Sequence, residues 1–385
     1  MEDNNLGVIL AKLSNGDVVR RYYKGIIIDF AGNRKVAGTS ILNGGCRDDL
    51  NSVFNFNCLA EEMSCELHED TYENELKSNA RSLGLNPDKT TGMSTAAWME
   101  MASVVSKKYK ELEVTAIVTA GIDTNGTRVG DPASYYEEAG VFHLIKPGTI
   151  NILLHINCNL PYGSMNRAIM TSAIAKAVAC EELFLGSVYS TGLATGSGTD
   201  GIIVVCDNES ENYLTDAGEH SKLGELIGIA VKEATKGALY KHTGAGPARQ
   251  HKLLVRGKRY GISTGSLWEY YINHKELFNK YENTDDIMNI RKFEKTLDDY
   301  NGSSSVVVFT SLYVHILDQL QWKMIEWAEA VRETKNIAVN FWNTMGIKDA
   351  TFDFKIDYNN NITDELVDQF KYIIIVMIFK VDIYG

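Results

Sequence analysis

The chain has 385 residues, of which 44% are hydrophobic and 23% charged, so it can bury a sizeable core, and these proportions exclude wholesale disorder. Its net charge is −12, and no block of lysine and arginine stands out from the mixed charges along the chain. This balance argues against nucleic acid and anionic membranes as the main partners.

The first 205 residues alternate strand-like and helix-like segments. Apolar, β-branched runs bounded by glycine or proline predict strands at residues 25–29, 114–119 and 149–156. Helices are predicted at residues 71–83, 94–109 and 165–183. His155 lies within the third strand and is expected to be a core histidine.

Residues 196–201 read Gly-Ser-Gly-Thr-Asp-Gly and formally match the Gly-x-Gly-x-x-Gly pattern of dinucleotide-binding turns. Such a turn needs a strand before it and a helix after it, because the helix N-terminus must face the pyrophosphate. Here the β-branched residues 202–205 follow and predict a strand instead. The segment is therefore predicted to be a strand-preceding loop at one rim of a sheet, and a nucleotide site is disfavoured.

A helix is predicted next, because Asp216 and Glu219 resemble a capping pair ahead of an apolar stripe. From about residue 240 charged helical segments predominate, including residues 322–342, and residues 372–379 are predicted to form a last strand. The fold class is α/β (or α+β), a mixed sheet with flanking helices and a mainly helical C-terminal region. Residues 1–240 are expected to form the α/β domain and residues 241–385 a mainly helical extension packed on it.

Six cysteines are scattered without the pairwise spacing of a zinc site, so neither a metal nor another cofactor is expected. The acidic N-terminal residues precede no apolar signal segment, and the longest apolar runs are too short to span a bilayer. A reduced, cytoplasmic protein without membrane contact is the simplest interpretation. A homo-oligomer is compatible with these features.

Five segments rich in glycine, asparagine, threonine and charged residues lie beside the apolar runs, at residues 43–47, 119–132, 148–151, 195–201 and 216–225. Each alone is more often a turn than a site. Together they are typical of the strand-end loops that bind ligands in α/β proteins, so we expect them to converge on one pocket. No Gly-x-Ser-x-Gly elbow exists, but the Ser197 and Thr199 hydroxyls are candidate nucleophiles or ligand hydrogen bonders.

A set of short motifs follows one another along the chain. They are Leu42-Asn-Gly-Gly-Cys-Arg47, Val53-Phe-Asn55, Thr115-Ala-Ile-Val-Thr-Ala-Gly121, Asn125-Gly126, Gly130-Asp-Pro132, Gly148-Thr-Ile-Asn-Ile152, Met170-Thr171 with Lys176, Ala194-Thr-Gly-Ser-Gly-Thr-Asp200 and His220-Ser-Lys-Leu-Gly-Glu-Leu-Ile227. In this order, the motifs resemble the adenosylcobinamide amidohydrolase family. The similarity covers residues 40–240 well and extends more loosely through the helical region.

The resemblance implies a corrinoid salvage hydrolase, an amidohydrolase acting on a linear, non-peptide carboxamide. It would cleave the amide that joins the aminopropanol arm to the corrin side chain of adenosylcobinamide and give adenosylcobyric acid. The expected partner is therefore a corrinoid small molecule. We expect it to be bound by polar residues of the loops: Asn43, Arg47, Asn125, Asp131, Asn151, Thr195, Ser197 and Thr199.

Amide hydrolysis needs a proton carrier and stabilisation of the tetrahedral oxyanion. We expect His220 to be the base and acid, Asp200 to be the orienting residue, and Lys222 or the N–H groups around residues 196–198 to be the oxyanion donors. Only one strand and a short connection separate these segments, so His220 and Lys222 are expected to face Thr199 and Asp200. Surface roles for His220 and Lys222 are the alternative.

Two other functions stay open. The family often has an acidic residue where this chain has Ile174, and no standard nucleophile arrangement is visible, so the chain could bind a corrinoid without turnover. It could also hydrolyse the amide of another substrate.

Overall fold

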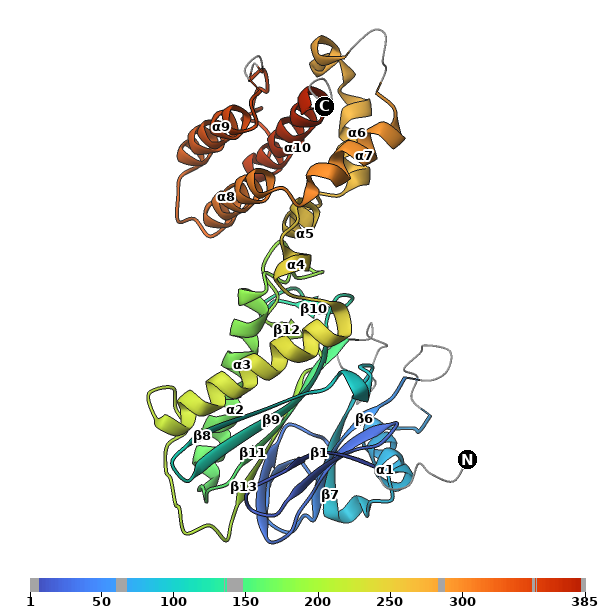
Figure 1. Ribbon diagram of the computed structural model, residues 1–385, viewed down its shortest axis with the longest axis vertical. Coiled ribbons are helices and arrows are strands. Elements are labelled where there is room, and N and C mark those ends of the chain that lie inside the picture. Colours follow the sequence, from blue (N-terminus) through green and yellow to red (C-terminus); the bar gives the residue numbers. More distant parts are fainter. Residues whose placement is uncertain are drawn as a thin grey trace. The chain divides into compact units, whose positions relative to one another are not determined.

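The computed structural model describes residues 7–59, 68–134, 136, 148–282, 288–347, 350 and 352–381. They belong to two compact units, residues 1–246 and residues 247–385. The first unit combines mixed sheets with helices and the second is helical (Figure 1), so the predicted fold class is confirmed.

A six-stranded sheet is the centre of the first unit. Its order is β5-β4-β13-β11-β9-β8, and every neighbouring pair is antiparallel except β11 with β13. Three central strands are buried along nearly their whole length, which explains their continuous apolar runs. The strands are β4 (Arg34–Gly38), β5 (Gly45–Arg47), β8 (Ser103–Tyr109), β9 (Leu112–Gly121), β11 (Thr149–Ile156) and β13 (Gly201–Asp207).

A five-stranded sheet packs on one face of the six-stranded sheet. Its order is β1-β2-β3-β6-β7, and β6 with β7 is its parallel pair. Alternate residues of both sheets, including Ile26, Val53, Ile117 and Leu153, fill the core between them. The strands are β1 (Val8–Lys12), β2 (Val18–Arg21), β3 (Gly25–Asp29), β6 (Ser52–Asn57) and β7 (Thr90–Thr95).

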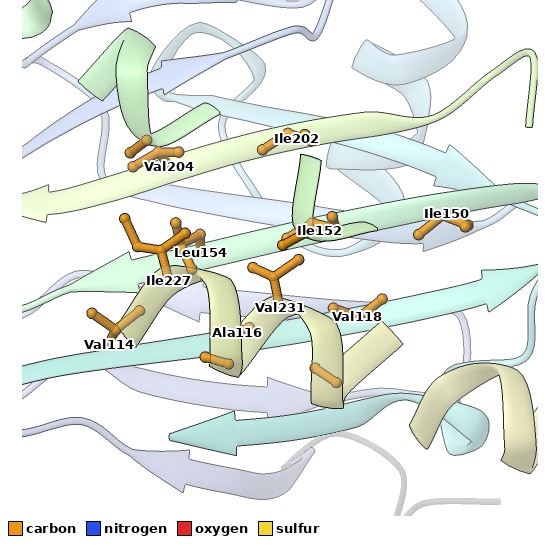
Figure 2. Packing of buried hydrophobic residues seen from close by; sticks show 14 of the residues in the cluster. Val114, Ala116, Val118, Ile150, Ile152, Leu154, Ile202, Val204, Ile227 and Val231 are labelled. Atoms are coloured by element: carbon orange, nitrogen blue, oxygen red, sulfur yellow. The ribbon is translucent and has the colours of Figure 1, made fainter. Parts of the chain in front are cut away.

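Helices cover the outer faces of this pair of sheets and complete a four-layer arrangement (Figure 1). The helices α2 (Tyr162–Glu182) and α3 (Lys222–Thr243) lie on the six-stranded sheet, while α1 (Tyr72–Ser82) lies on the five-stranded sheet. Figure 2 shows Ile227 and Val231 of α3 over the apolar residues of β9 and β11. Alternate side chains of each strand point to opposite faces of the sheet, so they pack in two different cores.

A buried ion cluster around Arg34 joins the two sheets. Arg34 Nε donates to Asp17 at 2.9 Å, and Arg34 Nη1 donates to Asp207 at 2.9 Å. His155 Nε2 lies 3.1 Å from the same Asp17 carboxylate, so His155 is a core histidine as predicted. Burial raises the pKa of Asp17, but hydrogen bonds from His155, Arg34 and the Ala31 backbone outweigh it and hold that pKa below its ordinary value.

The second unit packs its helices around α10 (Ile362–Val381). Every residue of α10 from Tyr372 to Phe379 is buried, among the aromatic side chains of the other helices. None of the helices in the described ranges is long and apolar enough to cross a membrane. The other helices of this unit are α4 (Pro247–Gln250), α5 (Leu253–Gly257), α6 (Thr264–Asn273), α7 (Ile290–Asn301), α8 (Ser304–Gln321) and α9 (Trp327–Thr344).

Two predicted elements are wrong. Residues 94–109, predicted to be helical, hold the end of β7, the short 3-10 helix η2 (Met99–Met101) and β8. Because β8 pairs along its whole length with β9, tertiary pairing decides its conformation. Residues 372–379, predicted to be a strand, lie in α10, because a uniformly apolar run has no periodicity that separates a strand from a buried helix.

The remaining predicted elements are confirmed, with two shifted starts: the helix predicted at residues 322–342 begins at Trp327, and the one expected near Asp216 also begins later. Strands at residues 25–29, 114–119 and 149–156 and helices at residues 71–83 and 165–183 are present. The helix expected near Asp216 begins at Lys222, because Ser221 is its cap: Ser221 Oγ accepts a hydrogen bond from the Gly224 amide at 3.0 Å. His220 therefore precedes the helix.

Replacing Arg34 by methionine is expected to destabilise the first unit by about 3–5 kcal/mol, because the buried Asp17 carboxylate loses its main ion pair. Arg20→Met is the matched control, since the side chains of Arg20 and Asp29 are 31% and 42% exposed and such pairs contribute at most about 1 kcal/mol. Urea unfolding followed by circular dichroism measures both changes. Equal losses in the two variants would contradict the structural role of Arg34.

Candidate active site

The candidate site lies at one end of the six-stranded sheet, where the turn before β13 meets the start of β11. The short strand β12 (Gly196–Ser197) pairs with β10 (Gly126–Thr127), and a turn leads directly into β13 at Gly201. The glycine-rich segment is thus a strand-preceding loop at the rim of the sheet, as predicted. A helix does not follow it, so the dinucleotide-binding geometry is absent from this described segment.

The Asp200 carboxylate is the centre of this turn. Its Oδ1 accepts hydrogen bonds from the Ile150 amide at 2.8 Å and from Ser197 Oγ at 2.7 Å. Its Oδ2 accepts from the Ser197 amide at 2.9 Å and forms an ion pair with Lys176 Nζ of α2. Asp200 therefore links β11, β12 and α2 through one buried charge, and both of its oxygens are engaged.

Two threonines fasten the same turn to β11. Thr149 Oγ1 donates to the Thr199 carbonyl at 2.8 Å, and Thr199 Oγ1 donates to the Gly148 carbonyl at 2.9 Å. Thr199 itself is exposed, and Ser197 is partly exposed with its hydroxyl 3.4 Å from that of Thr199. Thr199 and Ser197 are thus side chains of the turn that are at least partly open to solvent.

A layer of buried amides lies beneath this turn, between the two sheets. Asn151 Nδ2 donates to Asn55 Oδ1 and to the Ser94 carbonyl, both at 2.8 Å. Asn55 in turn donates to Thr119 Oγ1 at 2.8 Å. Asn151 is only 1% exposed, so it holds β11 against β6 and β7 and supports the turn from inside.

The loop that follows β9 lies beside β11 and β12. Asn125 Nδ2 donates to the Gly148 carbonyl at 3.0 Å, and its Oδ1 accepts from Tyr189 Oη at 3.0 Å. Thr195 Oγ1 accepts from the Val129 amide at 3.0 Å. Asn125 and Thr195 thus shape the loops around Asp200.

Asp131 fixes the far part of the same loop. Its carboxylate accepts hydrogen bonds from Ser187 Oγ at 2.6 Å and from the Arg128 amide at 2.8 Å. Burial raises the pKa of Asp131, but the hydrogen bonds from Ser187, Ser190 and Arg128 outweigh it, so the pKa lies below its ordinary value. A charged Asp131 is a loop anchor in this geometry.

Asn43 and Arg47 lie in and after the turn between β4 and β5. Asn43 donates to the carbonyls of Pro87 and Thr90, at 2.7 and 2.8 Å. Arg47 forms an exposed ion pair with Asp49 at 2.7 Å. Among the described residues, neither Asn43 nor Arg47 has a side-chain hydrogen bond to the Asp200 turn. The described part of the chain therefore shows no direct polar contact of these two side chains with the turn.

The expected facing of His220 and Lys222 with Thr199 and Asp200 is wrong. Lys222 Nζ lies 4.8 Å from the ring of Tyr109, which pairs with Leu112 at the start of β9. Asp200 binds the Ile150 amide, and Ile150 pairs with Ala120 at the other end of β9. At about 3.3 Å per residue, the two places are roughly 25 Å apart along the strand.

Lys222 lines a separate cavity at that opposite end. The cavity has a volume of about 680 Å³, and Tyr109, Lys110, Asp216 and Leu223 are among its lining residues. Lys222 also forms an ion pair with Glu225, an acidic partner within its own helix. The five segments therefore do not converge on one pocket, since residues 216–225 belong to the opposite end.

Lys176 is the main site residue absent from the predicted set. It is a lone charge in the alanine-rich run of α2, and its side chain is 13% exposed. A single lysine in an otherwise apolar helix face is the signal that could have identified it, because such a charge needs a partner. Ile174 is two residues earlier, on the opposite side of α2, and is 48% exposed, so it points away from Asp200.

The arrangement can bind amide groups and hold a hydroxyl in a fixed orientation. Ser197 Oγ is oriented by Asp200, and Lys176 supplies a positive charge behind it. Such preorganised donors stabilise the oxygen on which charge develops during attack on an amide. The Asp200 carboxylate positions the turn, because both of its oxygens accept hydrogen bonds from the protein.

Comparison with known proteins gives one family and one related sequence. The family model described as adenosylcobinamide amidohydrolase matches residues 10–247. An uncharacterised protein of Methanocaldococcus jannaschii is 38% identical over 181 residues, covering 44% of this chain and 69% of that protein. The family match spans the four-layer unit and the Asp200 turn.

Two solved structures are partly similar. The crystal structure of the PH0078 protein from Pyrococcus horikoshii OT3 has a TM-score of 0.32 and 14% identity, covering 67% of this chain and 91% of that one. A beta-aminopeptidase from Burkholderia sp. has a TM-score of 0.30 and 13% identity, covering 61% of this chain and 82% of that one.

Replacing Gly196 by alanine is expected to disrupt the Asp200 turn. Gly196 has a φ of +157°, and an added Cβ would lie 2.5 Å from Lys176 Nζ and closer still to Asp200 Oδ2. Gly198→Ala is the control, because a Cβ there meets nothing within 4 Å. We expect a loss of stability of about 1–3 kcal/mol for Gly196→Ala alone. Thermal unfolding measures it, and similar behaviour of the two variants would contradict the close packing.

Proposed function

The chain belongs to the adenosylcobinamide amidohydrolase family, enzymes of corrinoid salvage, and we propose that the Asp200 turn is where its amide hydrolysis takes place. The observation that carries this proposal is the family match over residues 10–247, which spans nearly the whole four-layer unit. The reaction cleaves the amide between the aminopropanol arm and the corrin side chain and gives adenosylcobyric acid. A corrinoid is accordingly the substrate.

The assignment of the reaction to this turn rests on the chemistry of its groups. Ser197 and Thr199 present accessible hydroxyls, and Lys176 adds a positive charge close to them. A corrinoid is fringed with amides, which hydrogen-bond well to such hydroxyls and to loop amides. Ser197 and Thr199 bind the scissile amide or its neighbours, while Asp200 orients Ser197.

The loop residues around this turn are the proposed substrate-binding set. Asn125, Asp131 and Thr195 shape the loops through which the corrinoid reaches the turn, and Asn151 supports it from below. Asn43 and Arg47 are proposed to contact more distant parts of a substrate as large as a corrinoid. Residues 1–240 form the amidohydrolase domain in this proposal, and residues 241–385 a helical extension.

Catalytic roles for His220 and Lys222 stay a prediction, and they imply a different location for the active site. They would require chemistry at the cavity beside Tyr109, at the other end of β9. Variants at the Asp200 turn and at the cavity beside Tyr109 distinguish the two locations. Only the variants at the true active site should lose turnover.

Incubation with adenosylcobinamide, followed by chromatography for adenosylcobyric acid, tests the activity itself. Visible spectral change on binding without product would favour a corrinoid-binding protein, and turnover of simple amides in parallel assays would favour another amidohydrolase. Product formation from adenosylcobinamide alone supports the proposed reaction.

Asp200→Asn is expected to lower turnover about 10²-fold, because the loss of its charge releases Lys176 and shifts the turn by a fraction of an ångström or more. Ser197→Ala tests the hydroxyl with less disturbance of the fold. Asp216→Asn and Lys222→Met, at the opposite end, are the controls and should keep near-normal turnover. Loss of turnover in the controls with normal Asp200→Asn would move the active site to the cavity beside Tyr109.

A further inference from the structure

Hydrolysis at the Asp200 turn needs a proton carrier that the turn does not supply. Both oxygens of Asp200 accept hydrogen bonds, from Ile150, Ser197 and Lys176. Lys176 is held in the largely buried ion pair with Asp200. A base that works near neutral pH must therefore come from another side chain at the same end of the sheet.

His242 occupies such a position. It lies in the last turn of α3 and packs against Gly121, the last residue of β9. A Cβ at Gly121 would lie 2.6 Å from His242 Cδ2 and 2.8 Å from Nε2, so the imidazole fills the space that the glycine leaves. Gly121 pairs with Thr149, whose hydroxyl binds the Thr199 carbonyl.

His242 and Asp200 belong to the same end of the sheet. Asp200 binds the Ile150 amide of β11, and Ile150 pairs with Ala120, the residue before Gly121 in the neighbouring strand β9. Adjacent strands are about 5 Å apart, so the residues that hold Asp200 and His242 lie close together at this rim.

The ring of His242 is also chemically available. Within the described ranges, neither ring nitrogen has a hydrogen-bond partner, and the side chain is half-buried. Burial lowers the pKa of His242 below its ordinary value of 6.5, and the charge of Asp123 partly offsets this. The neighbouring Lys241 is turned away and donates to the Ala102 carbonyl at 2.6 Å. Because its pKa is lowered, the imidazole of His242 is largely neutral at pH 7.

We propose that His242 is the proton carrier of amide hydrolysis at the Asp200 turn, an inference that rests on the proposed function. His242 takes a proton from water as the water oxygen bonds to the amide carbon. The tetrahedral intermediate then collapses, the carbon–nitrogen bond breaks, and His242 returns the proton to the leaving amine. The products are a carboxylic acid and the free aminopropanol amine, with His242 neutral again.

Two other histidines help to choose a control. His155 is buried and bound to Asp17, so replacing it would disturb the core. His315 is exposed on α8 of the second unit and belongs to neither candidate site. His315→Ala is therefore the control for His242→Ala.

The experiment measures kcat and KM of adenosylcobinamide hydrolysis between pH 5 and 9 for the wild type, His242→Ala and His315→Ala, with and without added imidazole. We expect His242→Ala to lower kcat about 10²-fold with KM little changed. Imidazole should restore part of the lost rate, and His315→Ala should resemble the wild type. Circular dichroism checks that both variants are folded.

The pH profile gives a second readout. As a base, His242 must be neutral, so wild-type kcat should hold down to about pH 6.5 and fall below its lowered pKa. This acidic limb should vanish in His242→Ala.

A His242→Ala variant with near-normal kcat would overturn the inference. So would a loss that imidazole does not restore while the acidic limb persists, because that pattern marks a structural role. A wild type that forms no product overturns the proposed function, and the inference falls with it.

Discussion

The largely buried carboxylate of Asp200 organises the functional end of the first unit. One carboxylate draws together the amide of Ile150, the backbone and hydroxyl of Ser197, and Lys176 of α2. A buried charge is costly unless every oxygen is compensated, so these groups must be in place together or not at all. The carboxylate thereby couples the helix layer to the sheet rim, and Gly196 is required because a side chain there would occupy the space of the ion pair.

Much of the fold could be predicted from sequence because its signals are local. The apolar runs of β3, β9 and β11 and the spacing within α1 and α2 identify these elements directly. β8 and α10 could not be predicted in this way, because pairing with β9 decides the first and burial on all sides removes the periodicity of the second. Local sequence preference gives way wherever tertiary partners determine the conformation.

Individual residues of the candidate site could be predicted from the sequence, but which of them lie together in space could not. The Ser197, Thr199 and Asp200 loop is identified by its composition and by the strand that follows it. Its true neighbour Lys176 is 24 residues away and on another layer. Proximity along the chain favoured His220, but α3 starts at the far end of β9 and returns only at His242. A helix of this length carries its first and last residues to opposite ends of the sheet.

The position of α10 has a consequence for how the protein is made. Translation proceeds from the N-terminus, so the four-layer unit can acquire all of its strands before any residue of α10 has left the ribosome. The helical unit must wait, because residues 372–379 supply the apolar centre on which its other helices pack. Until then the inner faces of α8 and α9 lack their cover, and nascent chains are exposed to aggregation and chaperone capture over that interval.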